Sequence, residues 1–120
     1  ACSFLGLRLQ LAVNTFMGGA LAAIGANCGN NIQEIEDVIA EMHASAPEVK
    51  LIAKANAGIP QWINNELVYD GTPAVMANYA RRVRGLGASL IGGCRGTTPV
   101  HIKAMSTALA TPLTQIEQAE

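Results

Sequence analysis

Charged and aromatic side chains are both scarce in this sequence of 120 residues. Only 14% of the residues are charged, 4% are aromatic, and the formal net charge is −1. So balanced and sparse a charge offers no basic surface for nucleic acid or for an anionic membrane. No apolar run approaches the ~20 residues that a membrane-spanning helix needs. We therefore expect neither a nucleic-acid partner nor a membrane partner.

Cysteine is also scarce, and its number is odd. Three cysteines at wide spacing do not form the pattern of a disulfide framework, which favours reduced thiols. The first residues do not read as a secretory signal, because Arg8 interrupts a short mixed stretch. These features predict a cytoplasmic protein.

Apolar residues make up half of the sequence and alternate between two periodicities. Short apolar runs bounded by glycine or asparagine predict buried strands, and apolar positions spaced three and four apart predict amphipathic helices between them. Such alternation is typical of an α/β fold with a parallel sheet. Three strands make a poor domain by themselves, so the pattern indicates part of something larger. We expect strands at about 22–27, 50–55 and 88–93, helices at 9–17, 31–46, 73–87 and 99–109, a long loop at 59–71 and a polar tail at 111–120.

The stretch from Leu90 to Pro99 has the clearest local pattern. An apolar strand end leads into a glycine-rich turn that carries Cys94, and Thr98-Pro99 then forms the start of a helix. Cys28 occupies the same place after the first strand, and Asn56 the equivalent place after the second. In a closed barrel these three residues face the same rim.

Two thiols and an amide on one rim suggest a soft metal ion, most plausibly zinc. Two isolated cysteines in an apolar sequence are also typical of small buried apolar residues. Their spacing alone does not decide between these interpretations.

Four ordered motifs add a resemblance that covers the chain from about residue 9 to 105. The sequence resembles the homocysteine S-methyltransferase domain family, whose fold is a (β/α)8 barrel. The resemblance implies that residues 1–120 are the C-terminal portion of such a barrel, with its last three strands. The motifs are GANCG (25–29), ANAG (55–58), YDGTP (69–73) and GGCRGTTP (92–99).

The family binds zinc through three cysteine thiolates, and two of them match Cys28 and Cys94 by motif. The third position is occupied by Arg95, which cannot ligate zinc and carries a fixed positive charge. Cys2, ahead of the first expected helix, is the alternative third ligand that the sequence offers. The resemblance also implies that Asn27 and Asn56 line the substrate pocket.

Transfer of a methyl group to the sulfur of homocysteine, giving methionine, is the activity that the resemblance implies. Homocysteine and a methyl donor are then the partners. We expect the isolated chain to be inactive, since Arg95 replaces a ligand and most of the pocket belongs to earlier strands. The alternative is a non-catalytic α/β fragment without bound metal that associates with itself. Three parallel strands have unpaired edges in either case, so we expect a homo-oligomer.

Overall fold

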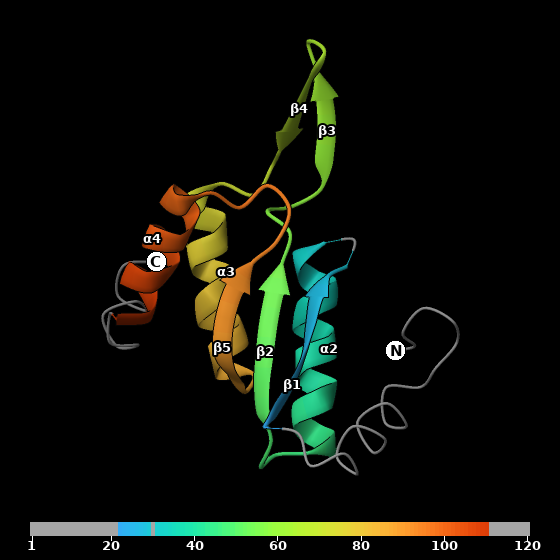
Figure 1. Cartoon of the computed structure of the whole chain (residues 1–120), viewed down its shortest axis with the longest axis vertical. Coiled ribbons are helices and arrows are strands. Elements are labelled where there is room, and N and C mark those ends of the chain that lie inside the picture. The colour runs from blue at the N-terminus through green and yellow to red at the C-terminus, as the bar shows by residue number, and fades with distance from the viewer. Residues whose placement is uncertain (1–21, 30, 111–120) are drawn as a thin grey trace.

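The computed structural model describes residues 22–29 and 31–110 (Figure 1). The expected helix at 9–17, Cys2 and the tail at 111–120 lie outside these residues. The described elements, in chain order, are β1 (Ala23–Cys28), α2 (Ile32–Ser45), β2 (Lys50–Ala55), β3 (Pro60–Ile63), β4 (Glu66–Tyr69), α3 (Pro73–Gly85), β5 (Ala88–Gly93) and α4 (Pro99–Ala110).

β1, β2 and β5 form a parallel sheet with β2 in the centre. The register pairs Cys28 with Ala55 across β1 and β2, and Ala55 with Gly93 across β2 and β5. The carboxyl ends of all three strands therefore lie at one edge of the sheet. This arrangement confirms the prediction of three parallel strands that alternate with helices, and β1 begins one residue later than expected.

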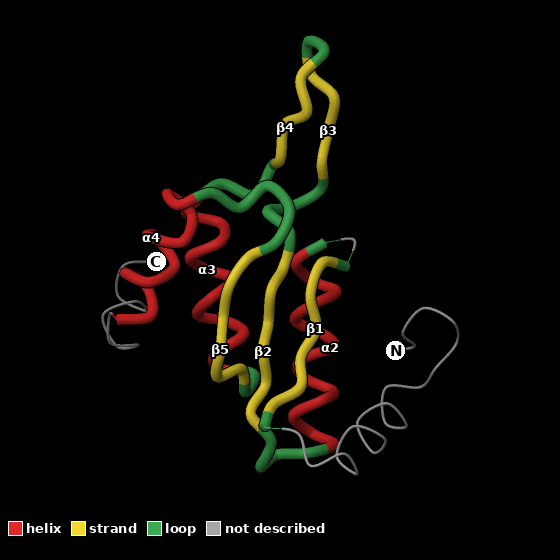
Figure 2. Tube along the Cα trace, viewed as in Figure 1, coloured by secondary structure: helices red, strands yellow, loops and turns green. Residues whose placement is uncertain are grey.

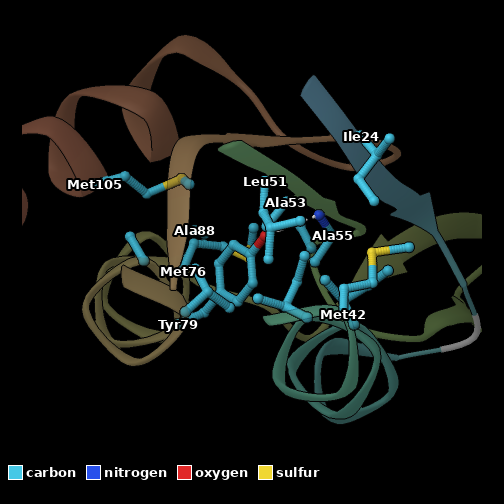
Figure 3. Close-up of a cluster of buried hydrophobic side chains, with 14 residues drawn as sticks. Ile24, Met42, Leu51, Ala53, Ala55, Met76, Tyr79, Ala88 and Met105 are labelled. Atoms are coloured by element: carbon cyan, nitrogen blue, oxygen red, sulfur yellow. Dashed lines mark hydrogen bonds between the residues drawn. The ribbon is translucent and has the colours of Figure 1, made fainter. Parts of the chain in front are cut away.

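Helices α2 and α3 cover one face of the sheet, and the core lies between them and β2 (Figures 2 and 3). Leu51, Ala53 and Ala55 alternate along β2 and are fully buried against these helices. α2 contributes the apolar stripe that its sequence predicts. The buried side chains that the helices supply are Ile35, Ile39 and Met42 from α2, Met76, Tyr79, Ala80 and Val83 from α3, and Met105 from α4.

Helices α2 and α3 each begin at a polar N-cap. The side chain of Asn31 accepts a hydrogen bond of 2.8 Å from the backbone N–H of Glu34 at the start of α2. The hydroxyl of Thr72 accepts one of 3.2 Å from Val75 at the start of α3. α3 ends at Gly85, two residues earlier than expected, and Gly87 takes a φ of +118° where the chain turns into β5.

The prediction of a loop from residue 59 to 71 is wrong for residues 60–63 and 66–69, which form strands. β3 and β4 form an antiparallel hairpin that projects from the strand ends (Figure 1). Asn64 and Asn65 form its two-residue turn with φ values of +51° and +64°. Asparagine tolerates this left-handed conformation, which a tight hairpin turn of this kind requires at both positions. The hairpin side chains are largely exposed, with Trp62 at 75%.

α4 packs beside α3, and the guanidinium of Arg84 in α3 donates a hydrogen bond of 2.6 Å to the carbonyl oxygen of Leu109. This contact satisfies a carbonyl in the last turn of α4. None of the helices in the described part of the chain is long and apolar enough to cross a membrane.

Candidate functional site

The thiols of Cys28 and Cys94 lie together at the carboxyl edge of the sheet. Their sulfur atoms are 2.9 Å apart, both side chains are half-buried, and both cysteines are free. β1 and β5 are not neighbours, so the two thiols meet across the end of β2. The edge formed by the strand ends is where α/β folds place their chemistry.

Local backbone conformation turns each cysteine toward the other. Cys28 has a φ of +65° and Gly29 one of +70°, so the chain bends sharply at the end of β1. After β5, a Cβ on Gly93 would stand 2.2 Å from the hydroxyl oxygen of Thr97. Glycine is therefore needed at position 93 for the turn that presents Cys94.

Asn56, at the end of β2, connects the two turns that carry the cysteines. Its amide nitrogen donates a hydrogen bond of 3.0 Å to the carbonyl oxygen of Gly29, and its amide oxygen accepts one of 3.2 Å from the N–H of Arg95. The side chain is almost completely buried. Asn27 is exposed on the opposite face of β1 from the helices, in register with Lys54. The substrate-binding roles of Asn27 and Asn56 stay predictions.

The two thiols differ in acidity because they share a hydrogen bond. The bond from Cys28 lowers the pKa of Cys94, and the backbone N–H of Arg95 and the charges of Lys54 and Arg95 act in the same direction. The same hydrogen bond, followed by burial, raises the pKa of Cys28. Cys94 is therefore the thiol that ionises first, with Cys28 as the donor to its thiolate.

Two thiols are an incomplete ligand set for zinc. Tetrahedral coordination with Zn–S bonds of ~2.3 Å places two sulfur atoms about 3.8 Å apart, so these two would have to separate. The described residues contain no group of three or more potential metal ligands, and Arg95 holds the position that follows Cys94. Within the described part of the chain, the side chains present do not fit a complete zinc site.

The hairpin of β3 and β4 is anchored to the same edge through contacts that the sequence does not reveal. The ring of Tyr69 packs on Gly96, where a Cβ would stand 2.4 Å from it. The carboxylate of Asp70 accepts a hydrogen bond of 2.8 Å from the N–H of Ile59. His101, in the first turn of α4, places its Nε2 2.8 Å from the carbonyl oxygen of Gly71.

Comparisons with known proteins confirm the resemblance that the motifs indicated. The family model described as homocysteine S-methyltransferase matches residues 5–109. The chain is 29% identical over 107 residues to methionine synthase of Mycobacterium tuberculosis (strain ATCC 25618 / H37Rv), with 88% of this chain and 9% of that protein covered. It is 32% identical over 103 residues to methionine synthase of Mycobacterium leprae (strain TN), with 78% and 8% covered.

A solved structure agrees with these sequence relatives. The homocysteine methyltransferase MmuM from Escherichia coli, in its oxidized form, matches with a TM-score of 0.66 and 26% identity. The match covers 85% of this chain and 30% of that one. The chain thus spans less than a tenth of the length of the two curated relatives and under a third of the structural one.

Proposed function

Because the chain belongs to the homocysteine S-methyltransferase family, we propose that it forms the thiol-bearing part of a domain that methylates the sulfur of homocysteine. In that reaction the homocysteine sulfur forms a bond to the methyl carbon, and the bond between this carbon and the donor breaks. Homocysteine loses its thiol proton and becomes methionine. The observation that supports this proposal best is the pair of cysteine thiols, 2.9 Å apart at the strand ends.

Arg95 is proposed to weaken zinc binding at this pair. The resemblance implies a zinc ion held by three thiolates, and zinc would supply a means of keeping the homocysteine sulfur ionised. In this chain a fixed cation follows Cys94 where the family has the third thiolate. We therefore propose an impaired site in which Cys28 and Cys94 remain as ligands.

The remaining substrate contacts are expected on parts of the domain that these residues do not include. The proposed partners are homocysteine and a methyl donor, with Asn27 facing the open side of the sheet near the site. The proposed setting is the cytoplasm, where thiols remain reduced. The isolated chain is proposed to be inactive.

The alternative is a non-catalytic chain that associates with itself. The observation that favours it is the exposed apolar surface on the face of the sheet opposite the helices, where Leu90 is 54% exposed. This alternative requires neither zinc nor homocysteine.

A chimaera tests the proposed function. Residues 5–109, which match the family model, replace the corresponding segment of the E. coli methyltransferase, with Arg95 retained in one version and Arg95→Cys in the other. We expect methyl transfer to homocysteine with Arg95→Cys, and much slower transfer with Arg95. A folded Arg95→Cys chimaera that binds zinc but does not methylate homocysteine would contradict the proposal. The Arg95→Cys version that also carries Cys94→Ser is the negative control.

A further inference from the structure

Asn56 is a buried polar residue, and both of its side-chain hydrogen bonds within the described part of the chain go to the backbone of the two cysteine turns. Gly29 directly follows Cys28, and Arg95 directly follows Cys94. These turns are 66 residues apart in sequence and lie on strands that do not pair with each other. A single carboxamide therefore connects the two segments whose separation sets the distance between the thiols.

The two turns depend on this carboxamide to different degrees. The Cys94 turn has further bonds to the end of β2 and to the residues that follow it. The N–H of Cys94 donates to the carbonyl oxygen of Ala55, and the N–H of Ala57 donates to that of Arg95, each at 2.8 Å. For the Cys28 turn, the described residues show no such backbone bond beyond the register of the strand. Beyond the pairing of Cys28 with Ala55, the link that the described residues show between that turn and the end of β2 is the bond from Asn56 to Gly29.

We propose that Asn56 is a positioning residue, which sets the separation of the Cys28 and Cys94 thiols by holding both turns through one carboxamide. This inference rests on the proposed function, which gives the thiol pair its role. Only a side chain with a donor and an acceptor on one short stem satisfies both turns. Alanine satisfies neither, and an ionised aspartate keeps the acceptor for Arg95 but places a negative charge beside the carbonyl of Gly29.

The test measures the spacing of the thiols with a probe that must bind both. Phenylarsine oxide reacts with two thiols to form two As–S bonds and releases one water, with arsenic remaining in the trivalent state. The full chain carries Cys2→Ser, so that only Cys28 and Cys94 can react. Iodoacetamide, which needs one thiol, reports the reactivity of each cysteine separately, and circular dichroism reports the fold.

Asn56→Ala is expected to lower the affinity for phenylarsine oxide by about 10–100-fold. Removing a hydrogen-bond partner that orients the ligands of a metal site has an effect of this size. Alkylation of each single thiol is expected to change far less than this affinity, because iodoacetamide needs one thiol at a time and senses their separation only through the hydrogen bond that they share. Asn78→Ala, which removes a half-buried carboxamide of α3 that accepts a hydrogen bond from Arg81, is the matched control and should leave the affinity unchanged. A purely stabilising role would change the melting temperature but not the ratio between the two reagents.

If the alanine variant does not fold, Asn56→Asp tests whether residue 56 positions the two thiols. At neutral pH its carboxylate cannot donate to Gly29, and the affinity should fall relative to the parent chain at the same pH. Below the pKa of this carboxyl group a donor returns, and the relative affinity should recover. Parental affinity for phenylarsine oxide in Asn56→Ala, or in Asn56→Asp at both pH values, would overturn the inference. The assay uses neither zinc nor homocysteine, so an inactive chimaera would not affect it, and its failure would leave the proposed function standing.

Discussion

The two faces of the three-stranded sheet differ in how far their side chains are exposed. Leu51, Ala53 and Ala55 are 0% exposed beneath α2 and α3, whereas Leu90 is 54% exposed on the other face. The other face also carries Lys54, whose stem lies across Gly92. In a closed barrel this second face points inward and packs against the other strands in layers. The described residues therefore include packing partners for the outer face of the sheet but not for its inner face.

Self-association is the largest expected consequence of the open face. Burial of about 300 Å² of apolar surface at ~25 cal/mol per Å² contributes roughly 7.5 kcal/mol. The outer sides of β1 and β5 pair with no other strand among the described residues, so each can accept a further strand. We expect light scattering at micromolar concentration to give a mass above that of one chain. Leu90→Lys should shift this mass toward the monomer. Val100→Lys adds the same charge on α4 and should not. A folded, strictly monomeric parent chain would contradict this prediction.

The same truncation on the two faces should differ in its effect on stability. Leu51→Ala opens a cavity under the helices and is expected to lower the free energy of unfolding by about 2–5 kcal/mol. Leu90→Ala, on the neighbouring strand β5, should change it by less than about 1 kcal/mol. Denaturant unfolding of both variants at one low protein concentration measures the difference. Equal losses for the two variants would mean that the faces are packed alike.

Removing one hydroxyl group under the helices should lower the free energy of unfolding less than truncating a whole side chain there does. Tyr79 in α3 is fully buried, and its oxygen accepts a hydrogen bond of 3.2 Å from the N–H of Ala55 (Figure 3). Tyr79→Phe leaves this N–H without its partner and is expected to cost about 1–3 kcal/mol of unfolding free energy. If denaturant unfolding gave Tyr79→Phe the same free energy of unfolding as the parent chain, this hydrogen bond would make no net contribution to stability.

Burial of Tyr79 also predicts a dependence of stability on alkaline pH. Burial raises the pKa of Tyr79 to about 12, from an ordinary value of 10.0. Above pH 10 the unfolded chain loses this proton while the folded chain keeps it, so stability falls as the pH rises toward 12. The slope is at most ~1.4 kcal/mol per pH unit for one group. Tyr79→Phe should lack this component, and an unchanged slope in that variant would contradict the assignment.

The smallest expected effect is a difference between the two thiols at the strand ends. Hydrogen bonding from Cys28 lowers the pKa of Cys94 and raises that of Cys28. We therefore expect iodoacetamide to modify Cys94 before Cys28 at neutral pH, as read by peptide mass mapping. Faster modification of Cys28 would reverse the assigned direction of the hydrogen bond.

The parallel sheet and its helices could be predicted from the sequence because their signals are local. Asn31 and Thr72-Pro73 mark helix starts, and glycines mark the strand ends. The hairpin escaped prediction because its strands are short and exposed, and its Asn64-Asn65 turn lacks the usual glycine.

The cysteine pair was predictable from equivalent positions on two strands. The links made by Asn56 were not, because its partners are backbone atoms 27 and 39 residues away. Hydrogen bonds to distant backbone atoms leave no pattern of residue types in a sequence.

Zinc titration of the full chain and of Arg95→Cys tests most directly whether the cysteine pair is a zinc site that lacks one ligand. Arg95→Ala is the control that removes the charge without adding a thiolate. The binding free energy of a four-ligand zinc site is ~10–16 kcal/mol, and an equal share for each ligand corresponds to roughly 10²–10³-fold in affinity. We predict at least this gain for Arg95→Cys and a much smaller one for Arg95→Ala. Tight, stoichiometric zinc in the unmodified chain, equal to that in Arg95→Cys, would contradict this interpretation of the site.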